Sequence, residues 1–164
     1  MKSAEAKLNL QNGEIMRAVV TRVNEASVTI DGEVTGQIGR GFLILLGITQ
    51  DDTPAICRKV AEKVLGLRIF TDENYKMNKS LADVGGSVLV VSQFTLYADV
   101  SHGRRPSFIG AAGPDLAVPL YEQFLSECER LGFPPQHGTF GAHMKVASVN
   151  DGPVTIIVDS KDLK

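Results

Sequence analysis

Residues 16–48 decide the fold, and they read MRAVVTRVNEASVTIDGEVTGQIGRGFLILLGI. Within them, 26–30 alternate apolar and polar side chains, which is the period of a strand with one buried face. Asp31–Gly32 predicts a two-residue type I′ hairpin turn, because both central positions of that turn need positive φ. A return strand over 33–38 follows, and the continuous apolar run 42–48 predicts a strand buried on both faces.

Two helices are predicted further along the chain. The first begins at Pro54 behind the N-cap Thr53, and its apolar residues recur every three or four positions as far as Leu67. The second covers 120–131. Its start is left open between Pro114 and Pro119, because proline fits the first turn of a helix but breaks its interior.

The other strand-like runs complete the expected architecture. Loops are predicted over 71–86 and 99–113, and a turn at 150–153 is expected between the last two strands. The strands are expected over 87–98, 140–148 and 154–158. The fold class is therefore α+β, a mainly antiparallel β-sheet or barrel with two packed helices.

The chain divides into one domain and a short leader. A single domain is predicted over 16–164, which is within the usual size of one domain. Residues 1–15, MKSAEAKLNLQNGEI, lack the apolar segment of a secretory signal. They are interpreted as a disordered leader or as residues left by cloning.

Composition excludes several classes of protein. The net charge of −2 excludes a general basic coat for nucleic acid, although a local basic patch stays possible. The apolar runs are far too short to span a bilayer, so no membrane partner is expected. The two cysteines have no metal-ligand or disulfide spacing, which favours the reducing cytoplasm. The absence of tryptophan and the 6% aromatic content argue against stacking platforms for single strands.

Two polar motifs interrupt apolar stretches and are the candidates for chemistry. They are Ser92-Gln93-Phe94-Thr95-Leu96 and Asn150-Asp151-Gly152-Pro153-Val154-Thr155. Buried polar groups cost free energy unless they are satisfied, so the first motif either builds a site or bonds to neighbouring backbone. The second motif is by composition either a plain turn or part of a site.

Other constellations are weak. His102, His137 and His143 lack the spacing of a metal site, and His143 is expected to face solvent. The chain has no nucleophile elbow and no phosphate-binding glycine loop. Arg104 and Arg105 could meet phosphates, although a solvated loop is the commoner reason for such charges.

Taken together, the two motifs resemble the signature motifs of the D-aminoacyl-tRNA deacylases. Three further blocks in the same order also resemble that family: the opening strand with its hairpin, 16–32, then 105–108, RPSF, and 140–144, FGAHM. The resemblance covers nearly the whole chain from Met16. The leader departs from the pattern, and so does His143, where many members are expected to have aspartate.

The resemblance implies an activity and its partners. A homodimer would hydrolyse the ester between a D-amino acid and the 3′-terminal ribose of tRNA, and would also remove glycine mischarged onto tRNA for alanine. No metal or organic cofactor is implied. The homodimer would have cross-subunit active sites that take the 3′ end of aminoacylated tRNA, with Arg104 and Arg105 as candidates for backbone contacts.

The resemblance also implies roles for single residues. The substrate's own 2′-hydroxyl would help to activate water, the backbone N–H groups near Phe94 and Thr95 would stabilise the oxyanion, and Thr95 would position substrate rather than attack it. The Gly152–Pro153 bond would be cis, enter the partner's pocket and exclude L side chains by collision. Arg22 would hold this loop. Phe140 and Met144 would lie around the terminal adenine. The remaining expected site residues are Ser92, Gln93, Asn150 and Thr155.

Three rival interpretations remain at this point. A non-catalytic tRNA-binding module should have a basic face. A hydrolase with a Ser, Thr or Cys nucleophile needs a base within reach of that nucleophile. A structural protein with accidental motifs would leave Gly152–Pro153 exposed and trans.

Overall fold

The long strand β1 (Arg17–Ile30) organises the computed structural model, which describes residues 15–164. Strand β8 (Lys145–Asp159) pairs with β1 along one edge. The other edge of β1 pairs first with β3 (Gly41–Gly47) and then with β2 (Glu33–Ile38). The predicted hairpin at Asp31–Gly32 is confirmed, because both residues have positive φ between β1 and β2.

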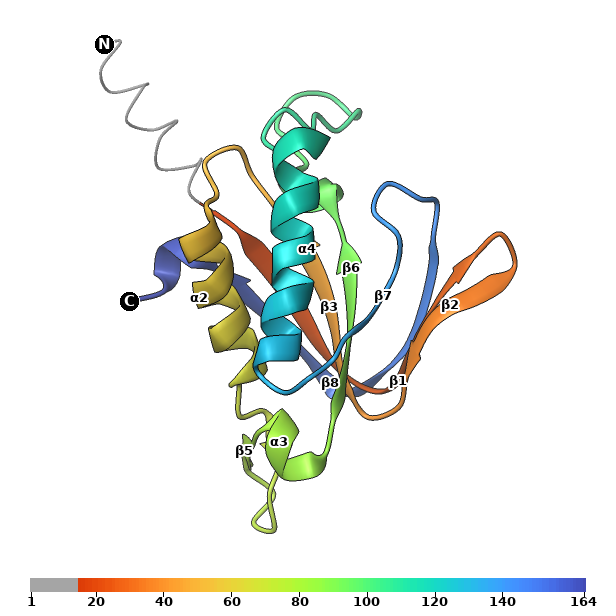
Figure 1. Ribbon diagram of the computed structural model, residues 1–164, viewed down its shortest axis with the longest axis vertical. Coiled ribbons are helices and arrows are strands. Elements are labelled where there is room, and N and C mark those ends of the chain that lie inside the picture. The colour runs from red at the N-terminus through yellow and green to blue at the C-terminus, as the bar shows by residue number, and fades with distance from the viewer. Residues whose placement is uncertain (1–14) are drawn as a thin grey trace.

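The sheet closes through two parallel pairings. Strand β6 (Ser87–Ser92) lies parallel to β3, and β7 (Gln136–His137) lies parallel to β6. Strand β2 then approaches β7 so closely that a Cβ on Gly36 would lie 2.8 Å from the His137 carbonyl oxygen. The result is a nearly closed, mainly antiparallel barrel, and the predicted α+β class is confirmed (Figure 1).

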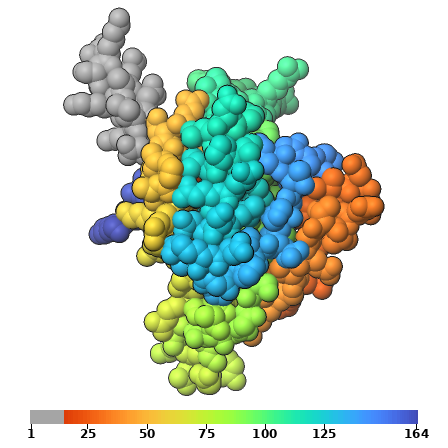
Figure 2. Space-filling model, in the orientation of Figure 1, coloured from red at the N-terminus to blue at the C-terminus, as the bar shows by residue number. Residues whose placement is uncertain are grey.

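Two helices cover one face of this sheet. Helix α2 (Pro54–Leu65) begins where the sequence predicts, and the Thr53 hydroxyl accepts from the Ile56 N–H at 3.3 Å. Helix α4 (Pro114–Arg130) packs beside α2, as Figures 1 and 2 show. The predicted span 120–131 omits the first turns of α4. The helix begins at Pro114, within the range that the sequence left open, and Pro119 lies inside it.

Strict alternation along the strands builds a core on each face of the sheet. On β3, Phe42, Ile44 and Leu46 pack toward α2 and α4. Leu43 points to the opposite face, where it joins a second buried cluster that includes Leu89 of β6. The expectation that this strand is buried on both faces is therefore confirmed.

The predicted strand over 87–98 was too long. Strand β6 ends at Ser92, and residues 94–97 form a 3₁₀ turn, η1 (Phe94–Tyr97). The Gln93 N–H still donates to the Leu46 carbonyl at 2.8 Å, but the Leu96 N–H turns back to the Gln93 carbonyl. The alternation of strand side chains therefore does not extend to Thr95, because the chain leaves the sheet after Gln93.

The C-terminal strands also differ from the prediction. Strand β8 begins at Lys145, so 140–144 is loop; Gly141 has positive φ there. No hairpin separates 140–148 from 154–158, because β8 runs on in one direction through Asn150. The motif forms a bulge: between the pairs Thr21–Thr155 and Val23–Asn150, β1 advances two residues while β8 advances five.

The predicted loop 71–86 contains regular structure as well. A third, short helix and a small hairpin lie there: α3 (Leu81–Val84), β4 (Phe70–Thr71) and β5 (Met77–Lys79). A second 3₁₀ turn, η2 (Ser160–Asp162), follows β8. Of the predicted leader, only Ile15 is described, and the rest of that interpretation lies outside the described residues. Within 15–164 no helix is long and apolar enough to cross a membrane.

Candidate active site

A cavity of about 250 Å³ opens at the end of β6. Ser92, Gln93 and Phe94 line one part of it, and the loop before β8 lines another with Phe140 and Met144. The cavity thus brings residues of the Ser92–Leu96 motif together with residues of the 140–144 block. Apolar side chains make up most of the remaining lining: Leu46, Ile48, Val91, Ala112, Ala117, Ala142 and Val146. An apolar cavity with a few polar groups is the usual form of a small-ligand site.

Thr95 lies next to this cavity, and its hydroxyl is already engaged. The Gln93 side-chain amide donates a hydrogen bond to the Thr95 hydroxyl oxygen. Within residues 15–164, this amide is the side-chain group that hydrogen-bonds to the Thr95 hydroxyl, and an amide is not a base. A threonine hydroxyl is a weak nucleophile without an adjacent base, so the geometry favours a positioning role.

The backbone of η1 supplies hydrogen-bond donors beside the cavity. In a 3₁₀ turn each N–H donates to the carbonyl three residues before it, so the first N–H groups have no acceptor within the turn. Here the first bond is from Leu96 N–H to the Gln93 carbonyl, at 3.2 Å. The N–H groups of Phe94 and Thr95 precede it. Two neighbouring donors of this kind can stabilise an oxyanion.

Side chains outside the two polar motifs hold η1 in place. Arg17 donates to the Leu96 carbonyl at 3.2 Å, and its Nε lies 2.6 Å from Asp159 Oδ1. This hydrogen bond to Asp159 raises the pKa of Arg17. The Tyr97 hydroxyl donates to the Gly47 carbonyl at 3.0 Å. Arg17 lies in the family-like opening strand, but only the fold brings that strand beside η1.

The second motif builds a braced bulge elsewhere on the sheet. The Gly152–Pro153 peptide bond is cis, as the resemblance implied, and both residues are exposed. Arg22 is only 8% exposed, and it donates to the Asp151 carbonyl at 2.9 Å and to the Ile69 carbonyl at 2.8 Å. The predicted contact of Arg22 with this loop is therefore present.

Asn150 and Thr155 close the base of the same bulge. The Asn150 side-chain oxygen accepts from the Val154 N–H at 2.9 Å. Its amide nitrogen donates to the Thr155 hydroxyl at 3.2 Å. Both residues are thus joined to each other across the bulge. They do not line the cavity, so within one chain their contacts brace the loop.

The bulge and the Ser92 end of the cavity lie at different levels of the sheet. Ser92 is level with Leu46 on β3, whereas Asn150 is level with Val23, which pairs with Gly41 at the start of β3. Five residues of β3 separate these levels, or about 17 Å at about 3.3 Å per residue. Neither Gly152 nor Pro153 is among the residues that line the chain's own cavity.

The remaining candidate groups form no second reactive centre. Burial raises the pKa of the thiols of Cys57 and Cys128 to about 12, which leaves both as inert thiols at neutral pH and opposes a cysteine hydrolase. His143 is exposed, as expected, and lies at the cavity wall. Within residues 15–164, no group of three or more His, Cys, Asp or Glu could hold a metal ion.

A family model and several known proteins match most of this chain. The family model described as D-Tyr-tRNA(Tyr) deacylase matches residues 19–159. A D-aminoacyl-tRNA deacylase of Roseiflexus castenholzii is 60% identical over 145 residues, which are 88% of this chain and 92% of that protein. The D-aminoacyl-tRNA deacylase of Thermomicrobium roseum is 58% identical over 149 residues, covering 91% of this chain and 97% of the relative.

Solved structures agree on the fold. A structure titled "c-Myc DNA Unwinding Element Binding Protein" has a TM-score of 0.82 and 43% identity, and the match covers 87% of this chain and 97% of that one. A second, titled as a probable eukaryotic D-amino acid tRNA deacylase, has a TM-score of 0.75 at 19% identity, which shows the fold alone. With the family model and the relatives matching nearly all of residues 16–164, this chain belongs to the D-Tyr-tRNA(Tyr) deacylase family.

Proposed function

We propose that residues 16–164 form a single deacylase domain that hydrolyses the ester bond between a D-amino acid and the 3′-terminal ribose of tRNA. The products are the free D-amino acid and reusable tRNA. The enzyme is thus a carboxylic ester hydrolase that proofreads chirality in translation. Because charged tRNA is made and used in the cytoplasm, we place the reaction there. The observation that carries the proposal is the apolar cavity beside the free N–H groups of η1.

The residues divide the chemical work as follows. Phe140 and Met144 hold the terminal adenine in the apolar part of the cavity. Water attacks the ester carbonyl with help from the substrate's 2′-hydroxyl, and the N–H groups of Phe94 and Thr95 stabilise the negative charge that develops on the carbonyl oxygen. Gln93 fixes the Thr95 hydroxyl, which orients the ester. Ser92 shapes the adjoining wall. No metal or organic cofactor takes part.

Selection between D and L substrates needs a second copy of the chain. The exposed Gly152–Pro153 bulge does not line its own cavity, and in a homodimer it would enter the partner's. There its carbonyl groups would face the substrate's α-amino group, and an L side chain would collide with the wall. Rejection by collision excludes the wrong hand without requiring affinity for any one D side chain. Glycine has no side chain to collide, so glycine mischarged onto tRNA for alanine is also a substrate.

We expect the enzyme to make few contacts with the body of the tRNA. The net charge of −2 gives no broad basic surface. Arg104 and Arg105 lie exposed in the loop after η1, where they can contact phosphates near the acceptor end. Few phosphate contacts keep binding transient, which suits an enzyme that must release deacylated tRNA.

The decisive experiment compares two stereoisomers of one substrate. Purified protein is incubated with D-Tyr-tRNA and with L-Tyr-tRNA, and release of tyrosine is measured against spontaneous hydrolysis in buffer. We expect rapid release from D-Tyr-tRNA only, because the wall excludes the L side chain. Glycine on tRNA for alanine should also be released. Equal release from both stereoisomers, or release from neither, contradicts the proposal, and tight binding of deacylated tRNA without hydrolysis would favour the non-catalytic module.

Thr95→Ala tests whether the threonine is a nucleophile. We expect kcat/KM on D-Tyr-tRNA to stay within about tenfold of the parent, because the hydroxyl orients the ester rather than attacking it. Thr95→Ser, which keeps the hydroxyl, is the matched control and should fall closer to the parent. A loss of more than about 10⁴-fold in the alanine variant, with the serine variant active, would establish covalent catalysis instead.

A further inference from the structure

Two exposed phenylalanine rings form one unit at the rim of the cavity. Phe94 lines the cavity and is 57% exposed, while Phe108 is 36% exposed. Their ring centroids lie 5.2 Å apart and the ring planes meet at 75°, which is the edge-to-face arrangement that aromatic pairs prefer. Exposed paired aromatics beside a cavity need an explanation, because soluble proteins rarely leave such surface uncovered without a function.

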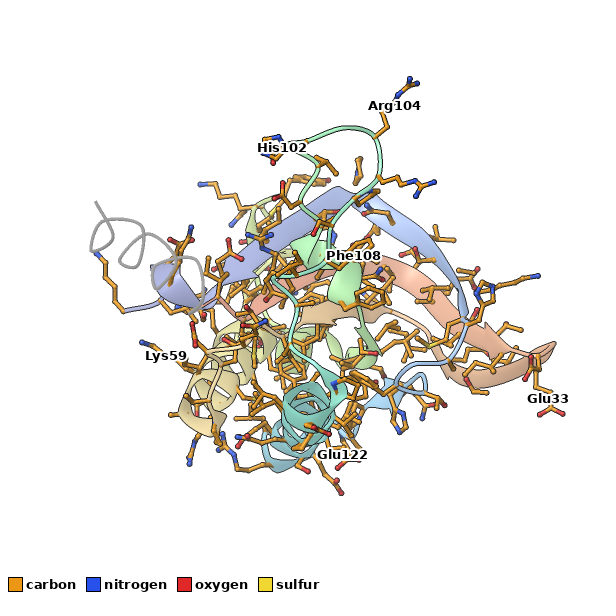
Figure 3. The ribbon with its side chains drawn as sticks, turned by 90° about the horizontal axis from the view of Figure 1, so that it is seen from above. Glu33, Lys59, His102, Arg104, Phe108 and Glu122 are labelled. Atoms are coloured by element: carbon orange, nitrogen blue, oxygen red, sulfur yellow. The ribbon has the colours of Figure 1, made fainter. Side chains whose placement is uncertain are left out.

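Hydrogen bonds on both sides of Phe108 hold its backbone in place. Ser107 and Asp99 exchange two backbone hydrogen bonds, at 2.7 and 2.9 Å, which close the base of the loop that carries Arg104. On the other side, the Thr49 hydroxyl donates to the Gly110 carbonyl at 2.7 Å. Figure 3 shows the result: Arg104 and His102 project from the loop, whereas Phe108 lies nearer the body of the molecule.

The charge around the rings fits a polyanion. Arg104 and Arg105 are exposed on the loop. The carboxylate at the start of the loop, Asp99, accepts the Ser101 N–H at 2.9 Å. The loop that carries Phe108 therefore also carries two exposed cations. Aromatic faces combined with nearby cations are the features that bind single-stranded nucleic acid, because every base has a face on which to stack.

We propose that Phe94 and Phe108 form a stacking platform for the unpaired base of the nucleotide that precedes the terminal adenosine of the tRNA. This inference rests on the proposed function, which places that adenosine in the cavity. The strand must leave the cavity at its rim, and the preceding base then meets the exposed aromatic pair. The low aromatic content of the chain does not oppose the platform, because the fold gathers two of its seven phenylalanines at one place.

The experiment separates this nucleotide from the rest of the substrate. Kinetics are measured on D-Tyr-tRNA and on D-tyrosyl-adenosine, which carries the same ester and the terminal nucleoside but no preceding nucleotide. Phe108→Ala should raise KM for D-Tyr-tRNA about tenfold, with kcat within about twofold. The same variant should behave like the parent on D-tyrosyl-adenosine. Phe108→Tyr, which keeps the aromatic face, should restore KM, and Phe108→Leu should not.

Ile109→Ala is the matched control. Ile109 neighbours Phe108 in the same loop and is 83% exposed, but it has no ring. Its replacement should leave both substrates unaffected.

Three results would overturn the platform: no change in the alanine variant, equal losses on both substrates, or an altered molecular mass in solution, which would assign the rings to a subunit contact. Failure of the parent enzyme to hydrolyse either substrate is a different outcome, because it refutes the proposed function itself.

Discussion

Replacing Gly152 with alanine is expected to lower kcat/KM on D-Tyr-tRNA by about 100-fold, since a displacement of about 1 Å at a reacting centre can cost that much. Gly152 has a φ of +136°, a conformation that residues with a Cβ rarely adopt. The new Cβ would lie 2.7 Å from Val154 Cγ2, 3.0 Å from the Val154 nitrogen and 3.1 Å from Arg22 Nη2. The contacts that brace the bulge must therefore shift, and the chirality wall moves with them.

Gly132→Ala separates this effect from simple backbone strain. Gly132 also has a positive φ, +95°, but a Cβ there would meet nothing within 4 Å. The control variant should lose about 1 kcal/mol of stability and keep its activity. Thermal unfolding of both variants shows that each is folded at the assay temperature. Parent-like activity in a folded Gly152→Ala protein would refute the role assigned to the bulge.

Mixing two inactive variants tests where the bulge acts. Ala142→Phe is chosen to fill the cavity, because Ala142 lines it. If each bulge serves the partner's cavity, a mixed dimer with Gly152→Ala has one intact site. Random reassortment should then recover about a quarter of parental activity, because about half of the dimers are mixed and each has one working site. If each bulge served its own cavity, mixing would recover nothing.

The free energy of unfolding is expected to fall as pH rises from about 4 to about 6, through the buried carboxyl of Asp52. Asp52 is only 4% exposed, and its Oδ2 accepts from the Thr49 N–H at 2.8 Å. Among the described residues, Oδ1 has no hydrogen-bond partner. Burial raises the pKa of Asp52 to about 6, with a smaller contribution from Asp51, against the opposing effect of the Thr49 and Met16 N–H groups.

The sign follows from proton uptake. The unfolded carboxyl has a pKa of about 3.8, so between about pH 4 and pH 6 the folded protein binds more protons than the unfolded one. Stability is therefore highest below the unfolded pKa and is lost as pH rises through the folded pKa, by at most about 3 kcal/mol. Carboxylates with lowered pKa, such as Glu62 and Asp72, act in the opposite direction at lower pH.

Asp52→Asn isolates this contribution. Urea unfolding is measured from pH 4.5 to 7.5 for the parent and the variant, and the difference between the two curves removes what the other carboxyls contribute. We expect the variant to gain on the parent as pH rises to about 6 and the difference to level off above it. Asp51→Asn, at the exposed neighbouring position, should reduce the slope only slightly, because Asp51 makes a smaller contribution to the raised pKa than burial does. Parallel curves for the Asp52→Asn protein and the parent would contradict the assignment.

The sequence pattern correctly predicted the elements that are determined by residues close together in the chain. The turn at Asp31–Gly32 follows from the backbone conformation that glycine permits, and α2 follows from its cap at Thr53 and its apolar stripe. The continuous run in β3 fixed that strand as buried, whichever strands lay beside it. Local pattern was wrong where long-range pairing competes with it: Phe94–Tyr97 has strand-like residues but leaves the sheet, because nothing pairs with β6 beyond Leu46.

By itself, the sequence determined the α+β class, both signature motifs and, through their resemblance, the family. Only the tertiary structure decided which members of those motifs meet. Ser92, Gln93 and Phe94 reach one cavity with Phe140 and Met144, whereas Asn150, Gly152 and Thr155 belong to a bulge braced by Arg22 at another level of the sheet. The physical reason is that a motif fixes local backbone and chemistry, while distance between motifs is set by strand register, which depends on pairing between residues far apart in the chain.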